Sequence, residues 1–502
     1  MTLLDLFAAS AGRVPDHPAI VFRERHLTYR ALQRQAGTLS SVLRRIGLRA
    51  GDRAVLVCPN LPEFGIGYLG VLMAGAAVVP LNPLLKEDEV RYVLEDSGAT
   101  ALVCLQASLP VLRAARRGLP RRVPIVVLDA PIDGEPGDHS LLGAAAESSP
   151  PDMAAVGSED VAVCLYTSGT TGRPKGALLS HRNLIANLES FRAVLRVTEE
   201  DVFLAVLPLF HAYGATVLFL EPLSLGATIV VEPRFVPEAV LRAIAQHRVT
   251  FFAGVPSMYA VLAATPRPAG DFSSWRLCIS GGAPLPPAVL EAFEAQYGVP
   301  IYEGYGPTEC APVLTVNPPF GTRKIGSVGL PIPQVELCVV DDRGKAVPAG
   351  AVGEIVARGP NVMRGYLNRP AETAEALRDG WYHTGDLGRA DADGYMYIVD
   401  RKQDLILVGG LNVYPREVEM VLAAHPAVAE AAVVGMPDPV RGEAPKAFVI
   451  LRDGQPTVAQ ELLQWCRQRL ANYKVPRSIV VVPDLPRTVT GKILKSEIRS
   501  AV

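Results

Sequence analysis

Short apolar runs alternate, along the first 330 residues, with stretches whose apolar positions recur at helical spacing. Ala54–Val57 and Ala101–Cys104 have the length and side chains of buried strands, and Tyr29–Ile46 has the period of an amphipathic helix. Strands that alternate with helices predict a parallel sheet covered by helices on both faces. We therefore expect two doubly wound α/β subdomains, at about residues 1–160 and 161–330.

The pattern changes after residue 330. Between 331 and 400, alternating segments surround turns such as Asp341–Gly344, which predicts a small antiparallel β unit. A compact α+β segment follows Arg401. Residues 131–159 are rich in Pro, Gly, Ser and acidic side chains and are predicted to form an exposed connection.

Composition narrows the class of protein. The chain has 502 residues, of which 49% are hydrophobic and 20% charged, with a net charge of −2, so it is globular and no nucleic-acid partner is expected. Two uncharged runs, Phe64–Leu81 and Val202–Leu220, approach the length of a membrane span. Their Gly, Ala and Pro content favours buried core, so no transmembrane segment is expected, while peripheral membrane contact stays open.

The cysteines favour a reducing compartment. Seven are scattered without a close pair, which indicates neither a disulfide framework nor a zinc site, and a cytoplasmic location fits best. Asp5 interrupts any signal-peptide pattern at the N-terminus.

Residues 166–176 are the most informative segment of the chain. They read Tyr-Thr-Ser-Gly-Thr-Thr-Gly-Arg-Pro-Lys-Gly and follow the apolar run Val161–Leu165. Glycines let a backbone approach a ligand closely, and hydroxyls, N–H groups and two cations suit a polyphosphate. Because Lys175 precedes Gly176 and not Ser or Thr, the segment is not a Walker loop. A flexible surface hairpin is the alternative.

Four further clusters place polar residues between apolar runs. Ser280–Pro284 would let a flat ring lie on its backbone, and Tyr302–Glu309 offers an aromatic face, a hydroxyl and a carboxylate suited to Mg²⁺. Trp381–Asp386 ends in an acid that could accept both hydroxyls of a ribose, and Thr490–Lys492 holds a late lysine. Each has a plain alternative: a turn, a capping Asp or a surface lysine.

The order of these clusters resembles the adenylate-forming superfamily that includes acyl-CoA synthetases, adenylation domains and firefly luciferase. The resemblance extends from Leu4 to Arg499. Its blocks occur in the expected order at 166–176, Pro208–His211, Ser280–Pro284, Tyr302–Glu309, Trp381–Asp386, Asp400–Pro415 and Pro486–Lys492.

The resemblance implies a two-step ligase reaction. A carboxylate attacks the α-phosphate of ATP and releases pyrophosphate, and a thiol then displaces AMP from the acyl-AMP. Implied cofactors are ATP, Mg²⁺ and coenzyme A, and both steps depend on positioning and charge neutralisation. The resemblance also implies a large domain at 1–400 with a small β-barrel at 331–400, a hinge at 401–403 around Gln403, and a small mobile α+β domain at 404–502.

The roles that the resemblance implies fall into groups. Lys492 is the catalytic lysine that bridges the carboxylate and the α-phosphate, Glu309 carries Mg²⁺, and Thr308 contacts the α-phosphate. The β- and γ-phosphates are held by Thr167, Ser168, Gly169, Thr170, Thr171, Gly172 and Lys175. Adenine and ribose are held by Gly282, Ala283, Pro284, Glu303, Gly304, Tyr305, Asp386 and Arg401. The acyl pocket is lined by His211, Phe252, Val255, Gly281 and Gly306, and coenzyme A is contacted by Gly409, Gly410, Arg441 and Lys474.

Several alternatives stay open for the acid and for the acceptor. An amino acid is disfavoured because no acidic residue follows His211 before Glu221. The apolar pocket favours a medium- or long-chain fatty acid, with an aryl acid next, and Arg276 could pair with a dicarboxylic acid. An acyl carrier protein could replace coenzyme A, and a catalytically silent binding protein is the non-enzyme alternative. The chain could act as a monomer or a homodimer.

Overall fold

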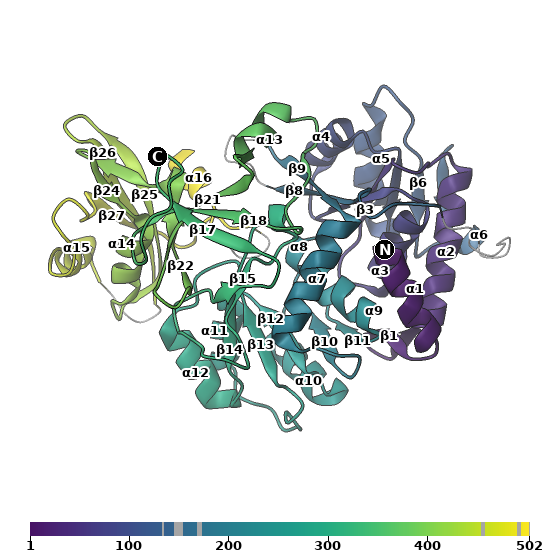
Figure 1. Ribbon diagram of the computed structural model, residues 1–502, viewed down its shortest axis with the longest axis horizontal. Helices are drawn as coiled ribbons and strands as arrows, with labels where there is room; N and C mark the ends of the chain where they lie inside the picture. The colour runs from purple at the N-terminus through teal and green to yellow at the C-terminus, as the bar shows by residue number, and fades with distance from the viewer. Residues whose placement is uncertain (133–134, 145–153, 168–172, 453–456, 489–492, 501–502) are drawn as a thin grey trace. The chain divides into compact units, whose positions relative to one another are not determined.

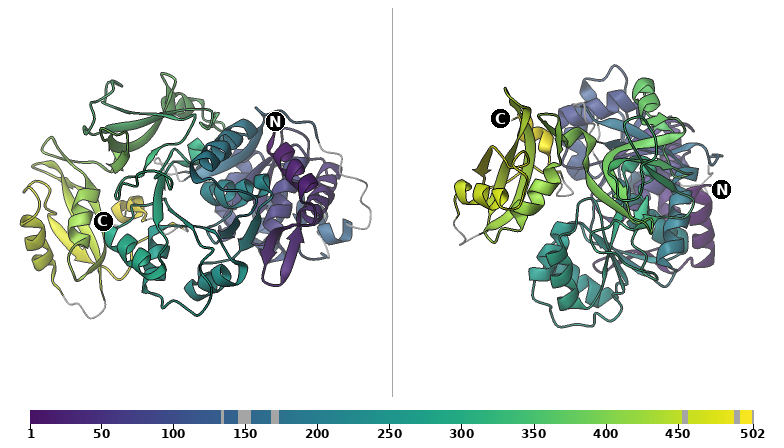
Figure 2. Two further views of the ribbon diagram at one scale, coloured as in Figure 1. Left: turned by 60° about the horizontal axis from the view of Figure 1, so that its bottom comes forward. Right: turned by 60° about the vertical axis from the view of Figure 1, so that its left-hand side comes forward.

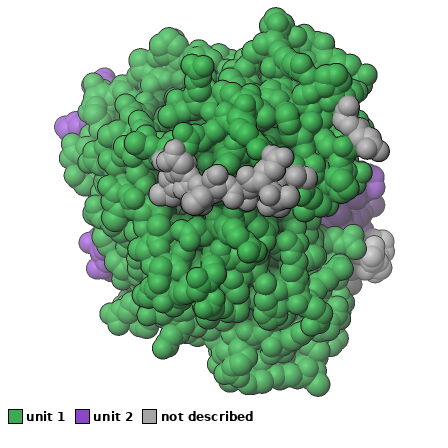
Figure 3. Space-filling model, turned by 90° about the vertical axis from the view of Figure 1, so that its right-hand side faces the viewer, with its two compact units in different colours: residues 1–336, 357–382 green, residues 337–356, 383–502 purple. Residues whose placement is uncertain are grey.

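The computed structural model describes residues 1–132, 135–144, 154–167, 173–452, 457–488 and 493–500. It divides into two compact units (Figures 1 and 3). Unit 1 comprises Met1–Glu336 and Ala357–Tyr382, and unit 2 comprises Leu337–Val356 and His383–Val502. The boundary at residue 400 and the hinge at 401–403 stay predictions.

The first large sheet of unit 1 has the order β19-β9-β8-β4-β3-β5-β6-β7. From β8 to β7 neighbouring strands are parallel, whereas β9 runs antiparallel to β8 and β19 antiparallel to β9. The predicted parallel sheet is therefore confirmed, with an antiparallel edge. Its strands are β3 (Arg53–Val57), β4 (Ala77–Leu81), β5 (Ala101–Cys104), β6 (Ile125–Val127), β7 (Asp138–Ser140), β8 (Val161–Thr167), β9 (Lys175–Ser180) and β19 (Gly365–Tyr366).

Helices cover this sheet on both faces (Figures 1 and 2). Val55 and Val57 of β3 pack with α4 (Glu87–Ser97) and α5 (Leu109–Arg117) in one core cluster. The Leu56 side chain points to the opposite face of the sheet, toward α3 (Pro62–Met73). A Cβ added to Gly67 of this helix would lie 2.5 Å from Leu56 Cδ1. The Phe64–Leu81 run is thus a closely packed helix and strand, as expected. Within the described ranges, no helix is long and apolar enough to cross a membrane.

The second large sheet has the order β16-β15-β14-β13-β12-β10-β11-β1-β2. Two strands from the N-terminal region, β1 and β2, join it, while β8 and β9 join the first sheet, so the sheets do not separate at residue 160. The parallel ladder runs from β14 to β1. Its strands are β1 (Pro18–Phe22), β2 (Arg25–Thr28), β10 (Val202–Ala205), β11 (Thr228–Val231), β12 (Phe251–Gly254), β13 (Leu277–Ser280), β14 (Ile301–Tyr305), β15 (Thr315–Val316) and β16 (Leu330–Pro331).

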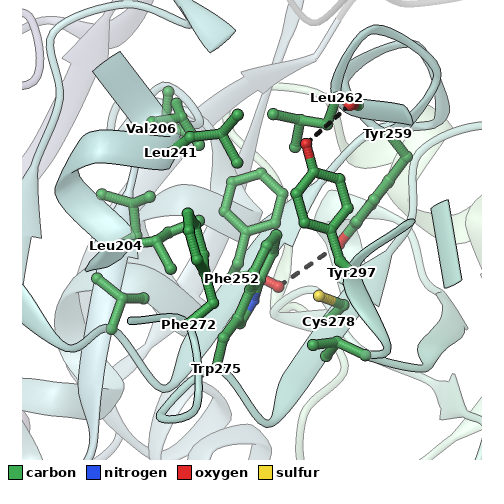
Figure 4. Close-up of a cluster of buried hydrophobic side chains, with 14 of the residues drawn as sticks. Leu204, Val206, Leu241, Phe252, Tyr259, Leu262, Phe272, Trp275, Cys278 and Tyr297 are labelled. Carbon is green, nitrogen blue, oxygen red and sulfur yellow. Dashed lines mark hydrogen bonds between the residues drawn. The ribbon is translucent and has the colours of Figure 1, made fainter. Parts of the chain in front are cut away.

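An aromatic core lies under this sheet, between its strands and the helices α10 (Pro237–His247), α11 (Pro256–Ala264) and α12 (Pro287–Tyr297). Figure 4 shows Phe252, Tyr259 and Trp275 packed together, with ring centroids of Phe252 and Trp275 5.9 Å apart. Tyr259 Oη donates to the carbonyl of Ile279 at 2.8 Å, which ties α11 to the end of β13. The loop that follows β13 therefore starts from a strand end that is hydrogen-bonded to the aromatic core.

The prediction that residues 131–159 form an exposed connection is wrong for part of the segment. Strand β7 pairs with β6, and the Asp138 side chain is fully buried. Two arginines of α5 explain its burial, since Arg113 Nη2 and Arg116 Nη1 lie 2.6 and 2.7 Å from its carboxylate oxygens. Burial of a carboxylate is tolerated when charged donors pair with it.

Helix α7 (His181–Leu195) has Ser180 as its N-cap, a position that serine favours, and Ser180 Oγ accepts from Asn183 N. The His181 ring is 2% exposed, and its Nδ1 accepts from the backbone N–H of Leu3 in helix α1 (Leu3–Arg13) at 3.3 Å. Burial lowers the pKa of His181 to about 4.

This histidine predicts an acid-dependent loss of stability. Because the folded-state pKa lies below the ordinary value of 6.5, the unfolded chain binds the extra proton first as the pH falls. The contribution of neutral His181 to the free energy of unfolding is complete above about pH 6.5 and is lost toward pH 4. The loss between pH 7 and pH 5 is roughly 2 kcal/mol. Urea unfolding of His181→Gln should show a flatter pH dependence than the wild type, and the exposed His26→Gln should match the wild type. Equal slopes for His181→Gln and the wild type would contradict this assignment.

Unit 2 contains antiparallel β structure in its first part, as expected. There β21 (Trp381–Ala390) pairs with β22 (Met396–Arg401) beside β17 (Glu336–Val340) and β18 (Gly353–Arg358). The C-terminal part confirms the α+β pattern. Its elements are β23 (Ile406–Val408), β24 (Leu411–Val413), β25 (Val428–Asp438), β26 (Gly442–Leu451), β27 (Ser478–Val481), α14 (Pro415–Ala423), α15 (Ala459–Arg467) and α16 (Lys495–Ser500).

Candidate active site

The predicted phosphate loop connects two antiparallel strands. Thr167 at the end of β8 pairs in register with Lys175 at the start of β9. The predicted ligands Ser168, Gly169, Thr170, Thr171 and Gly172 lie outside the described residues. The structure therefore describes the two ends of the loop.

Both ends of the loop are tied to helix α4. At the first end, Tyr166 Oη donates to Asp96 Oδ2 at 2.7 Å. At the second end, Tyr92 Oη donates to the carbonyl of Pro174 at 2.8 Å, and the Arg173 guanidinium lies 5.3 Å from the Tyr92 ring centroid. These contacts fix the separation of the two loop ends by way of one helix.

Lys175 and Glu309 both contact a third residue, Tyr366. The Lys175 Nζ lies 5.5 Å from the centroid of the Tyr366 ring, and Tyr366 Oη donates to Glu309 Oε1 at 2.8 Å. Glu309 is 8% exposed and sits in the short 3₁₀ helix η3 (Thr308–Cys310), directly after Thr308. Burial first, and then the Glu309 carboxylate, raise the pKa of Tyr366, so its hydroxyl stays protonated and donates.

The two predicted adenine segments lie side by side. Ser280 at the end of β13 pairs in register with Glu303 of β14, so Gly281–Pro284 and Tyr305 emerge from the same edge of the sheet. This edge, at the carboxyl ends of parallel strands, is where open α/β sheets bind ligands. Glu303 Oε1 accepts from the backbone N–H of Leu285, so its carboxylate holds the Gly281–Pro284 loop in place.

The predicted acyl-pocket residues divide into open and packed positions. Among the described residues, a Cβ added to Gly281 would meet only Gly304 O, at 3.4 Å, and one added to the neighbouring Gly282, assigned to adenine, would meet only Val255 Cγ1, at 3.7 Å. At Gly306, in contrast, a Cβ would lie 2.0 Å from Pro312 O, so glycine is required there by close backbone packing and not by pocket volume. The Phe252 ring is fully buried in the aromatic core.

His211 is the N-cap of the short helix α8 (Ala212–Ala215), and its Nδ1 accepts from Tyr213 N at 3.3 Å. A π-helical turn, Thr216–Leu220, follows this helix. The ring of His211 is exposed, as a residue that contacts a substrate requires.

The predicted ribose residues of unit 2 are neighbours. Asp386 and Arg401 pair in register between β21 and β22, and Arg401 Nε lies 3.3 Å from Asp386 Oδ1. Asp386 is 6% exposed, and Arg401 orients its carboxylate. The adjacent Lys402 Nζ lies 3.3 Å from Glu354 Oε2, which also lies 3.3 Å from His383 Nδ1.

The predicted coenzyme A residues differ in what surrounds them. Gly409 and Gly410 have φ values of +59° and +81°, and a Cβ added to either would meet no atom of the described residues within 4 Å, so they form an open turn that favours glycine. Lys474 Nζ lies 2.7 Å from both oxygens of Glu417, which already balances its charge. Arg441 contributes its backbone carbonyl to the turn, accepting from Gly409 N at 2.8 Å.

The models of two protein families match the chain: AMP-binding enzyme over residues 7–367 and AMP-binding enzyme C-terminal domain over residues 417–492. The chain belongs to the AMP-binding enzyme family.

Its relatives in this family are named as CoA ligases. A feruloyl-CoA synthase of Amycolatopsis sp. is 43% identical over 475 residues, which cover 94% of this chain and 93% of that protein. A long-chain-fatty-acid–CoA ligase of Bacillus subtilis (strain 168) is 37% identical, over 98% and 93% of the two chains. The crystal structure of ATP-bound MatB from Rhodopseudomonas palustris matches with a TM-score of 0.91 at 34% identity, over 100% and 99% of the chains.

As an AMP-binding enzyme, the protein is an ATP-dependent acyl-CoA ligase that uses ATP, Mg²⁺ and coenzyme A. Glu309 fits Mg²⁺ because it offers carboxylate oxygens in a buried position. Among the described residues, no group of three His, Cys, Asp or Glu side chains could hold a metal ion. Mg²⁺ is usually bound by one or two carboxylates together with substrate phosphates, and Glu309 can supply one such carboxylate.

Tyr366, Tyr92 and Asp96 were not predicted from the sequence of this AMP-binding enzyme. Tyr366 lies in a two-residue strand, and Asp96 lies in a helix whose pattern is that of an ordinary amphipathic surface helix. Their contacts join residues that are at least 57 positions apart in the sequence, and a local sequence pattern does not reveal such contacts. The predicted catalytic Lys492 lies outside the described residues.

Proposed function

We propose that this ligase activates an apolar monocarboxylic acid to an acyl-AMP and transfers the acyl group to coenzyme A, with a medium- or long-chain fatty acid as the first candidate. Lys492 would bridge the attacking carboxylate and the α-phosphate, which Thr308 also contacts. Glu309 would hold Mg²⁺. The remaining ATP contacts would come from Thr167, Lys175, Gly282, Ala283, Pro284, Tyr305, Asp386 and Arg401.

The observation that supports the phosphate assignment is that Lys175 and Glu309 both contact Tyr366. It places an ammonium group and a buried carboxylate within reach of one side chain, beside the ends of the loop 168–172. A polyphosphate that is bound with Mg²⁺ needs both a cation and carboxylate oxygens. A surface hairpin that binds no ligand would need neither the cation nor the carboxylate.

The pairing of two charged side chains, Arg276 and Glu221, supports a monocarboxylic acid. Arg276, which could have bound a second carboxylate, donates to Asp201 through Nε at 3.1 Å and through Nη2 at 2.7 Å, and Asp201 is 4% exposed. Glu221, the first acid after His211, is fully buried and pairs with Arg192 at 2.9 Å. Neither a dicarboxylic acid nor an amino acid therefore finds its counter-charge in these residues.

An aryl acid is the second candidate. The identity of 43% to a feruloyl-CoA synthase exceeds the 37% to a long-chain-fatty-acid–CoA ligase. The open space beside Gly281 and Gly282 would accept a flat ring as well as an alkyl chain. A hydrophobic pocket discriminates by only about 1–3 kcal/mol per methylene, so chain length is a matter for measurement.

Pyrophosphate exchange over fatty, aryl, dicarboxylic and amino acids tests the acid class. We expect kcat/KM to be highest for fatty acids, with aryl acids next, and exchange to be negligible with dicarboxylic and amino acids. Mass detection of the product with coenzyme A or with an acyl carrier protein then identifies the acceptor, for which we expect coenzyme A. Exchange with no carboxylic acid would refute the proposal, and exchange without acyl-CoA would favour the carrier protein.

The cysteines support a proposal for the compartment. The structure records all seven as free, and six of them are buried. Free thiols in this number suit a reducing environment, so we propose a cytoplasmic location.

A further inference from the structure

We propose that Tyr366 is the positioning residue of the phosphate site: its hydroxyl orients the Glu309 carboxylate toward the metal, and its ring holds the Lys175 ammonium group beside it. This inference rests on the proposed roles of Glu309 and Lys175.

The hydroxyl contact restricts the Glu309 carboxylate. Tyr366 Oη donates at 2.8 Å to Oε1, and Glu309 is 8% exposed, so water competes little for that oxygen. The backbone of Glu309 is fixed as well, because its carbonyl accepts from Met363 N at 2.7 Å. Partners of this kind orient metal ligands, and their loss typically costs 10–100-fold in metal affinity or activity.

The ring contact leaves the charge of Lys175 available. An ammonium within about 6 Å of a ring centroid is attracted by the π face. Here the distance is 5.5 Å. A carboxylate partner would neutralise the lysine, whereas an aromatic face positions it and leaves the full charge for a phosphate.

The backbone around Tyr366 is clamped to the loop ends. Its N–H donates to Thr373 Oγ1 at 2.9 Å, and Leu367 N donates to the carbonyl of Gly176 at 2.8 Å. Arg369 Nη2 donates at 2.8 Å to Asp96 Oδ1, and the other oxygen of Asp96 accepts from Tyr166. The strand that carries Tyr366 is therefore hydrogen-bonded directly to the first residues of β9.

Tyr366→Phe removes the hydroxyl and keeps the ring, so it separates the effects of the two groups. Mn²⁺ serves as the probe, titrated by electron paramagnetic resonance in the presence of the non-cleavable analogue α,β-methylene-ATP. We expect Tyr366→Phe to weaken Mn²⁺ binding about tenfold. Nucleotide affinity without metal should stay near the wild-type value. Tyr366→Leu, which also removes the ring, should weaken metal-free nucleotide binding by a further factor of about three to five.

Tyr297→Phe is the matched control, because Tyr297 Oη donates at 3.0 Å to the carbonyl of Leu262 inside the aromatic core (Figure 4). It should lower the melting temperature and leave Mn²⁺ binding unchanged, which separates lost stability from lost positioning.

Glu309→Gln separates this inference from the function on which it rests. If Glu309→Gln binds Mn²⁺ as the wild type does, the proposed role of Glu309 fails. If Glu309→Gln weakens Mn²⁺ binding and Tyr366→Phe does not, only the role of Tyr366 fails. We expect both single variants to weaken it, and Tyr366→Phe to have less than a twofold effect in the Glu309→Gln background, since the two act through one carboxylate.

Discussion

Lys492→Ala is expected to slow acyl-adenylate formation by roughly 100- to 1000-fold, the usual loss for one donor aimed at developing transition-state charge. The carboxylate and the α-phosphate are both anionic, and the lysine would bridge them as charge moves between them. Pyrophosphate exchange at saturating acid and ATP measures this step. Unchanged exchange would refute the assignment.

The residues that flank 489–492 are firmly held in unit 2. Arg487 and Ile493 form an antiparallel bridge, and Leu494 N donates to the carbonyl of Pro486 at 2.8 Å. The charged residues before and after this segment are paired with carboxylates of neighbouring elements. Arg487 Nη1 donates to Glu430 at 2.9 Å, and Lys495 Nζ lies 2.7 Å from Glu419 Oε1. Lys492→Ala should therefore remove the charge without loosening its surroundings.

Two controls separate the chemistry from general damage. Lys446→Ala removes a lysine from β26 of the same unit and should leave pyrophosphate exchange unchanged. Conversion of supplied acyl-AMP to acyl-CoA should also survive in Lys492→Ala, because the α-phosphate is no longer attacked by the acid. Parallel loss of both half-reactions would indicate misfolding instead.

Gln403→Pro is expected to spare adenylation and to slow thioester formation by about a hundredfold. Gln403 is exposed in the 3₁₀ turn Lys402–Asp404. A proline fixes φ near −65° and restricts the preceding residue, so a chain that must exchange between two backbone torsions is confined to one. The misfit of proline in an unsuitable backbone costs about 3 kcal/mol, which corresponds to about a hundredfold in rate.

Gln403→Ala is the matched control for this hinge. It removes the same side chain but keeps the N–H and the torsional freedom, so both half-reactions should proceed at the wild-type rate. Single-turnover formation of acyl-AMP and its subsequent transfer to coenzyme A, measured separately, decide the matter. Equal loss of both steps in Gln403→Pro would count against a hinge at this residue.

Features set by neighbouring residues could be predicted from the sequence. An N-cap such as Ser180 depends only on local sequence, because its hydroxyl accepts from an N–H three residues ahead. The strands Ala54–Val57 and Ala101–Cys104 were found because burial on both faces makes a strand continuously apolar. The common role of Gly281–Pro284 and Tyr305 came from the resemblance, and the register of β13 with β14 then brought the two segments to one sheet edge.

Features that depend on distant partners could not be predicted in this way. Asp138 was expected at the surface because its neighbours are turn residues, yet two arginines from α5 bury it. Gly306 was assigned to the pocket, although its lack of a side chain serves the close approach of Pro312. Tyr366 contacts Glu309, 57 positions before it, and Lys175 at the end of the phosphate loop, so its role became visible only in the fold.

Isotope transfer from the acid to AMP tests the central claim, that the acid attacks ATP at its α-phosphate and that the 166–176 loop serves the departing pyrophosphate. A fatty acid labelled with ¹⁸O in both carboxylate oxygens is converted to its CoA thioester, and AMP and pyrophosphate are analysed by mass spectrometry. We predict one labelled oxygen in AMP and none in pyrophosphate. Formation of ADP, or label in the pyrophosphate, would contradict the account.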